Sequence, residues 1–178
     1  MNILRKSTTL IIALAAATVL VAMAAGGDKP FAVFGAGESL LAAGNGATEL
    51  ESLTPAITRF AIRAVQPKGD VASGRFECIA IVPEAAAGTG SGEFTQNVMY
   101  VSGIVTGLEQ VDKDTAVISG IGPCTGIGAG TEVNFEVTVE RGGPGARLQL
   151  SVDTLPGVVF NEIVTDGLIE FTNRKMAP

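Results

Sequence analysis

The sequence contains no histidine, no tryptophan and only one tyrosine, Tyr100, in 178 residues. Without histidine the chain cannot form a Ser-His-Asp triad, a histidine zinc site or a histidine acid-base pair. The shortage of tryptophan and tyrosine also removes the aromatic platforms that are common in carbohydrate sites. Because these absences exclude most mechanisms of exported hydrolases, we predict that the protein is not an enzyme and uses no cofactor or metal.

Long apolar runs are scarce, and the clearest one lies near the start of the chain. Arg5 and Lys6 precede an apolar run over residues 10–25, which ends in small residues. This order of charged, apolar and small segments is typical of a secretory signal peptide. We predict cleavage near Ala24 and a secreted or periplasmic protein. Retention as an anchor is the alternative, since residues 8–25 are uncharged over a length that borders on a membrane span.

Basic side chains are fewer than acidic ones. Two of the 12 basic residues lie in the signal segment, which leaves 10 against 18 acidic residues and a formal charge of −8. Such a surface repels phosphates and anionic lipid head groups. We therefore predict no nucleic-acid partner, and membrane contact only through the signal segment if it is not cleaved.

Only two cysteines occur, Cys78 and Cys124, and both follow the signal segment. In an oxidising compartment, an even number of cysteines without histidine favours a disulfide over a metal site. The sequence therefore predicts a disulfide between Cys78 and Cys124, with two free thiols as the alternative.

Alternation of apolar and polar residues dominates after residue 56, and helical periodicity is nearly absent. Over residues 132–140 apolar and polar side chains alternate, and a glycine-rich turn at 142–145 leads into a second alternating run over 146–153. These two runs predict a hairpin. The stretch 101–122 predicts another, with the charged turn Val-Asp-Lys-Asp between its arms.

The whole pattern predicts an all-β fold, either an antiparallel barrel or a two-sheet sandwich of about eight or nine strands. We expect a signal peptide at 1–24, a weak first strand and a Gly/Ala-rich loop within 25–54, and the β-domain over 55–178. The remaining strands are expected at 31–41, 57–65, 74–82, 98–106, 115–121, 158–164 and 167–172. The glycine-rich segments expected to be loops are 42–51, 84–93 and 123–131.

Several strand motifs occur together in the order of a known pattern. They are Gly74 with Phe76, then Gly103, Val105 and Thr106, then Ala116, Ile118 and Gly120, and last Phe135, Val137 and Val139 before Gly143, Pro144 and Gly145. In this order the chain resembles an uncharacterised family of small secreted bacterial β-rich proteins with no established activity. The resemblance covers roughly residues 55–172 and implies a single β-domain. Arg141 and Arg147 stand where family members often carry acidic residues, so the resemblance implies no ion site here.

Paired acidic residues are the remaining candidates for chemistry. Glu132, Glu136 and Glu140 alternate on one strand face, and two carboxylates across a cleft could hydrolyse a glycoside. We interpret them instead as a solvated strand face. Asp112 and Asp114 lack the further ligands of a calcium loop, and we interpret them as turn residues that bond to backbone amides.

Two other motifs are incomplete. Gly35-Ala36-Gly37 lacks the third glycine and the following helix of a dinucleotide site. Ser39 and Ser91 have no histidine base to activate them, which argues against a nucleophilic role. The sequence therefore predicts a non-catalytic exported domain with a structural or recognition role and an unknown partner. The alternative is a carrier of a small apolar ligand inside a barrel.

Overall fold

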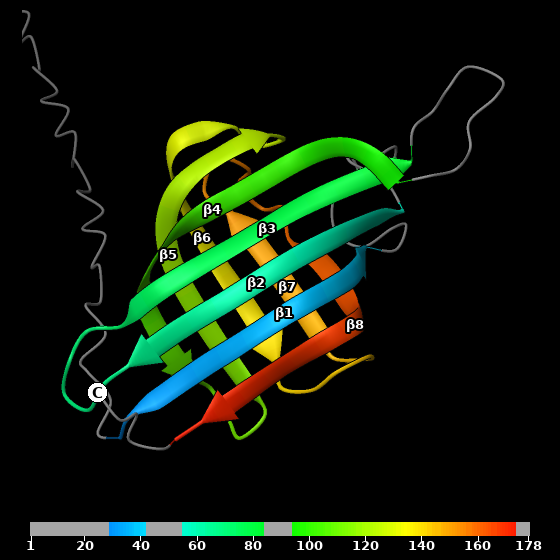
Figure 1. Cartoon of the computed structure of the whole chain (residues 1–178). Helices are drawn as coiled ribbons and strands as arrows, with labels where there is room; N and C mark the ends of the chain where they lie inside the picture. Colours follow the sequence, from blue (N-terminus) through cyan, green and yellow to red (C-terminus); the bar gives the residue numbers. More distant parts are fainter. Residues whose placement is uncertain (1–28, 42–54, 84–93, 174–178) are drawn as a thin grey trace, which may run out of the picture.

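The computed structural model describes residues 29–41, 55–83 and 94–173, which form an eight-stranded antiparallel barrel (Figure 1). Each strand pairs with the next along the chain, and the last pairs with the first. The predicted all-β fold is confirmed, and the barrel rather than the sandwich forms. The strands are β1 Phe31–Leu41, β2 Ala56–Gln66, β3 Ser73–Pro83, β4 Phe94–Gln110, β5 Thr115–Gly126, β6 Gly130–Glu140, β7 Arg147–Val152 and β8 Phe160–Thr172.

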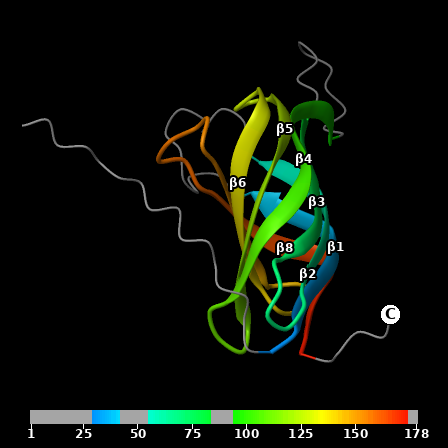
Figure 2. The ribbon, with the colours of Figure 1, turned by 90° about the vertical axis from the view of Figure 1, so that its left-hand side faces the viewer.

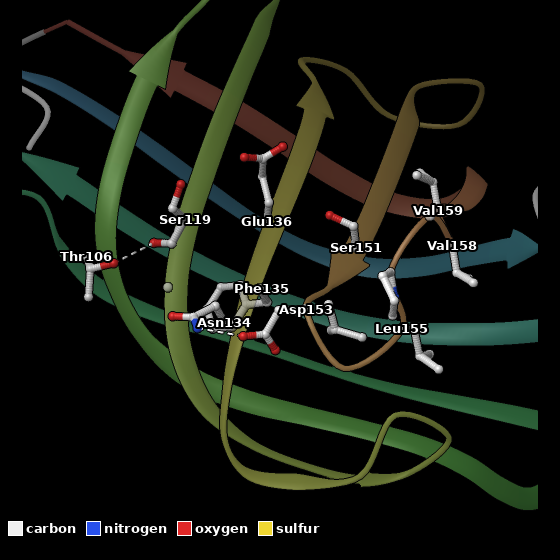
Figure 3. A pocket seen from close by; sticks show the side chains of 14 residues that line it. Thr106, Ser119, Asn134, Phe135, Glu136, Ser151, Asp153, Leu155, Val158 and Val159 are labelled. Carbon is white, nitrogen blue, oxygen red and sulfur yellow. Dashed lines mark hydrogen bonds between the residues drawn. The ribbon is translucent and has the colours of Figure 1, made fainter. Parts of the chain in front are cut away.

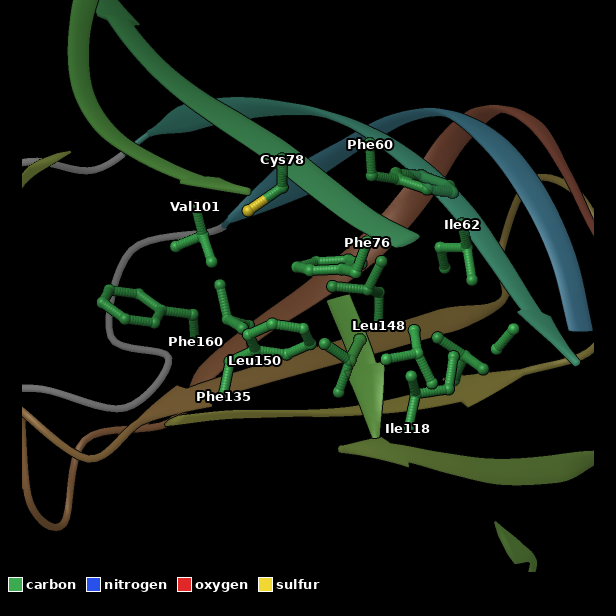
Figure 4. Close-up of a cluster of buried hydrophobic side chains, with 14 of the residues drawn as sticks. Phe60, Ile62, Phe76, Cys78, Val101, Ile118, Phe135, Leu148, Leu150 and Phe160 are labelled. Atoms are coloured by element: carbon green, nitrogen blue, oxygen red, sulfur yellow. The ribbon is translucent and has the colours of Figure 1, made fainter. Parts of the chain in front are cut away.

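Alternation along the strands fills the barrel interior. In β6 Val133, Phe135, Val137 and Val139 are buried, while the residues between them face outward. Strands β2 and β7 alternate in the same way, whereas β1 and β3 also bury consecutive residues, such as Ala32 beside Val33 and Ile81 beside Val82. A barrel of eight strands is just wide enough for side chains to fill it. Figure 4 shows these side chains converging from opposite walls. The predicted hairpins of β4 with β5 and of β6 with β7 are confirmed.

Two glycines make room for an aromatic side chain in the interior. Gly103 in β4 and Gly120 in β5 lie beside the ring of Phe135, and a Cβ atom at either position would collide with that ring. The same ring packs against Phe76 from β3, with 5.2 Å between the ring centroids. Glycine at these two positions therefore allows aromatic packing across the barrel.

Two details differ from the sequence-based expectation. The runs expected at 158–164 and 167–172 merge into one strand, β8, which begins only at Phe160 and whose pairing with β1 shifts by one residue between Glu38 and Ser39. Such a bulge bends the strand without ending it. Part of the predicted loop at 123–131 is strand, because β5 continues to Gly126 and pairs there with β4. The predicted signal peptide and the loops at 42–51 and 84–93 lie outside the described residues.

The connections lie alternately at the two ends of the barrel. In the turn between β4 and β5, the Asp112 side chain accepts a hydrogen bond of 2.7 Å from the amide of Asp114, which confirms the predicted turn chemistry for Asp112. The same bond lowers the pKa of Asp112. The Asp114 carboxylate instead accepts from the guanidinium of Arg141 over 2.7 Å. At the opposite end, residues 153–159 connect β7 to β8 and stand away from the barrel wall beside β6 (Figure 2). Among the described residues no helix could cross a membrane.

Candidate functional site

One acidic side chain lies inside the barrel. Glu162 is the second inward-facing residue of β8, between the apolar Phe160 and Val164, and only 4% of it is exposed. It is the only acidic or basic residue that is buried among the described residues. A buried charge without an ionic partner is unfavourable, so the surrounding hydrogen bonds decide how this group is tolerated.

Hydroxyl groups from two neighbouring strands satisfy the Glu162 carboxyl. Ser39 of β1 donates to one oxygen, and Thr58 of β2 donates to the other over 3.0 Å. The Ser39 hydroxyl also lies 3.4 Å from the backbone oxygen of Thr58. A protonated Glu162 could therefore donate to Ser39, which would then donate to that carbonyl. The same atoms can satisfy both protonation states.

Burial raises the pKa of Glu162 to about 7, and the bonds from Ser39 and Thr58 oppose the rise. Burial also raises the pKa of the Cys78 thiol, with a further contribution from Glu162. A perturbed carboxyl of this kind is a candidate for function. Here it is enclosed, because Ser39 is fully buried and Thr58 nearly so.

The two cysteines are free thiols in the structure, so the predicted disulfide between Cys78 and Cys124 is wrong. Both residues face the interior, and Val101 of β4 is the register partner of each. Because β4 lies between them, their Cα atoms are separated by two strand spacings, about 10 Å. Cysteines joined by a disulfide have Cα atoms within about 7 Å of each other. The Cys124 thiol donates instead to the carbonyl of Ile127 over 3.4 Å. The number of residues between the two cysteines could not reveal that β4 lies between their strands.

The outer wall carries a groove of about 480 Å³ (Figure 3). Its floor is formed by the outer faces of β5, β6 and β7, with Thr106 of β4 at its edge. One side is formed by the connection between β7 and β8. The groove exists because this connection rises from the barrel wall.

A row of polar side chains crosses the groove floor. Ser119 pairs in register with Glu136, and Glu136 pairs with Ser151 on the next strand. Directly opposite residues have Cβ atoms about 5 Å apart and project from the same face. In Figure 3 the three side chains stand side by side. No hydrogen bond joins the Glu136 carboxylate or the two serine hydroxyls to another described residue, so these groups are available to a ligand.

The rest of the groove combines apolar and polar groups. Leu155, Pro156, Val158 and Val159 form its apolar side, and Val159 is 38% exposed. Asp153 accepts a hydrogen bond of 2.6 Å from Asn134 on the floor. The hydroxyl of Thr154 donates to the backbone oxygen of Gly128 over 2.7 Å, which ties the connection to the neighbouring one. The side of the groove is therefore held at two points.

The sequence-predicted candidates are widely separated. Glu132, Glu136 and Glu140 lie on the outer face of β6, as predicted, but only Glu136 lines the groove. Asp112 and Asp114 are in a turn, and Gly35-Ala36-Gly37 lies within β1. Ser39 contacts Glu162 rather than a ligand, and Ser91 lies outside the described residues. No group of three or more potential metal ligands occurs among the described residues.

Sequence reasoning missed Glu162, Thr58, Ser119 and Ser151. A signal for the first two existed, because each interrupts an alternating apolar face, Thr58 between Ala56 and Phe60. No comparable signal marks the two serines, since polar residues are ordinary on an outer face.

The chain matches no protein-family model, no curated protein and no solved structure. The resemblance to secreted bacterial β-rich proteins therefore stays a prediction, and the geometry of the barrel is the basis for inferring function.

Proposed function

We propose that this protein is a non-catalytic, exported recognition domain that acts at the cell envelope or outside the cell. The groove on the outer wall is the observation that carries the proposal. It presents an unpaired carboxylate and two hydroxyl groups beside an apolar side. Ligand sites commonly combine apolar surface with a few convergent polar groups. Recognition therefore has more support than a purely structural role.

The alternative is carriage of a small apolar ligand inside the barrel. It has less support, because large side chains from every wall occupy the described interior, including Phe76, Ile118 and Leu148, which are fully buried. A ligand of any size would have to displace them, and rearranging a packed core is unfavourable. The groove needs no such rearrangement.

A catalytic role also has less support. The closest arrangement to a catalytic pair is the Ser39 hydroxyl bonded to Glu162. Both residues are buried, with 0% and 4% of their surface exposed, so a substrate has no access to them. The bond is better explained as satisfaction of a buried acid.

The proposal can be tested by NMR titration of the mature protein with four probes at millimolar concentration: n-pentylamine, pentanoate, 1-pentanol and maltose. We expect at least one probe to shift the amide signals of Ser119, Glu136 and Ser151 saturably, while those of Phe76 and Ile118 stay unchanged. Saturable shifts at the interior amides instead would favour the carrier. If no probe perturbs the groove, the proposal of recognition at this site is rejected.

A further inference from the structure

We propose that the groove binds a primary alkylammonium group, with Glu136, Ser119 and Ser151 holding the nitrogen and the apolar side holding the alkyl chain. This inference rests on the proposed recognition role, and it names the chemical class of the ligand. The same chemistry occurs in free alkylamines and in the lysine side chains of proteins.

Charge selects a cation. The side chains that line the groove include two carboxylates, Glu136 and Asp153, and no lysine or arginine. Asp153 is partly engaged by Asn134, whereas Glu136 has no described partner. An anionic ligand would be repelled by both carboxylates, and a neutral ligand would leave the Glu136 charge without a counterpart.

The number and arrangement of acceptors favour an ammonium group. An alkylammonium carries three N–H donors and no acceptor. The row across β5, β6 and β7 supplies a carboxylate in the middle with one hydroxyl oxygen on either side. A nitrogen above Glu136 could thus donate to three different side chains. A planar guanidinium prefers the two coplanar oxygens of one carboxylate and gains less from flanking serines.

The apolar side accommodates the carbon chain. Leu155, Val158 and Val159 border the groove beside the polar row, and the part of their surface that is not packed against the core would otherwise face water. Lysine and alkylamines bury their methylene groups along apolar surface while the charged end keeps polar contacts. The groove volume, about 480 Å³, exceeds the size of a single butyl chain, which leaves room for attached groups.

The two other outward glutamates of β6 lack this setting. The Glu140 carboxylate already accepts a hydrogen bond of 3.1 Å from the amide of Arg147. Glu132 lies before the first residue of β6 that pairs with β7, so no serine flanks it there. It is exposed on the same face of the same strand and does not line the groove. Glu132 therefore provides a matched control for Glu136.

The test is a titration of the mature protein with n-pentylamine, in which the amide NMR signals of the groove residues are monitored. We expect saturable binding on the order of 1 mM, because an exposed ion pair contributes little and a short chain buries little surface. Glu136→Gln should weaken binding by roughly two- to fivefold. Glu132→Gln should leave it unchanged, since this carboxylate is about 13 Å away along the strand and is screened by salt.

Two further series test the row and the apolar side separately. The double variant Ser119→Ala with Ser151→Ala should weaken amine binding while retaining the charge of Glu136. From ethylamine to n-pentylamine, each methylene group that becomes buried should tighten binding by up to roughly fourfold. Unchanged amide spectra away from the groove and unchanged melting temperatures would show that the variants fold.

Three results would overturn the inference: equal binding of 1-pentanol and n-pentylamine, tighter binding of n-butylguanidine, or equal losses in Glu136→Gln and Glu132→Gln. If maltose or pentanoate binds the groove and the amine does not, this inference fails while the recognition role stands. If nothing binds there, both fail. Tighter binding of Nα-acetyl-lysine methylamide than of n-pentylamine would identify a polypeptide lysine as the source, and the reverse order would identify a free amine.

Discussion

Glu162 inside the barrel and Glu136 on its outer wall have similar neighbours across the strands but opposite exposure. Glu162 lies near Ser39 and Thr58, and Glu136 lies between Ser119 and Ser151. Inside, both hydroxyls donate to the carboxyl, and the group is enclosed. On the outer wall, the Glu136 carboxylate and the hydroxyls of Ser119 and Ser151 form no hydrogen bond with another described residue. The same three polar groups thus form a closed network in one place and an open acceptor row in the other.

The difference shows how burial determines the role of an acid. Without water, the interior carboxyl must find partners in the protein, and its charged form is disfavoured. On the outer wall water can occupy the same positions until a ligand displaces it. We therefore expect Glu162 to determine stability as a function of pH, and Glu136 to determine binding.

The largest effect is expected for Glu162→Gln. The pKa of Glu162 is raised in the folded state from 4.5 to about 7, so the folded protein favours the protonated form. The resulting stabilisation is full below pH 4.5 and is lost as the pH rises through 7. The neutral variant lacks this loss. The difference in free energy of unfolding, variant minus wild type, should therefore be about 3 kcal/mol larger at pH 8 than at pH 4.

Urea unfolding at a series of pH values measures this difference. Subtracting the wild-type curve from that of the variant removes the contributions of the other acidic residues. A difference that stays constant between pH 4 and pH 8 would mean that Glu162 is not buried as the structure shows.

A smaller effect is expected when the hydroxyl donors of the interior network are removed. Ser39→Ala and Thr58→Val should each lower the free energy of unfolding by about 2 kcal/mol at pH 8, where the bond is to a charged group. At pH 4 the loss should be about 1 kcal/mol, since both partners are then neutral. Urea unfolding at the two pH values tests this, and equal losses would argue against donation to a carboxylate.

The smallest effect on stability is expected on the outer wall. Glu136→Gln, Ser119→Ala and Ser151→Ala should each change the free energy of unfolding by less than about 0.5 kcal/mol, because none of these groups is bonded within the described protein. Thermal unfolding of the three variants provides the measurement. A loss near that of Ser39→Ala would show that the row is part of the structural framework and would weaken its assignment as a binding site.

Much of the barrel could be predicted from the sequence, because alternation marks both the strands and their inward faces. The run over 132–140 predicted the burial of Val133, Phe135 and Val137 correctly. The same rule, applied to the last strand, would have placed Glu162 inside between Phe160 and Val164. Such an interruption of an apolar face is a usable sign of a buried polar network.

The groove could not be predicted in the same way. Its polar row depends on the registers that place Ser119 and Ser151 opposite Glu136, and a shift by one residue would turn these side chains inward. Its apolar side depends on the path of residues 153–159 away from the wall. Neither property follows from the composition of a single segment.

The comparison between the two glutamates is tested most directly by following both carboxyl ¹³C signals in one sample during titration with n-pentylamine at pH 7.5. We predict a saturable shift of the Glu136 signal and no change in the Glu162 signal. A shift of Glu162 with none at Glu136 would contradict the account, because it would place the ligand inside the barrel.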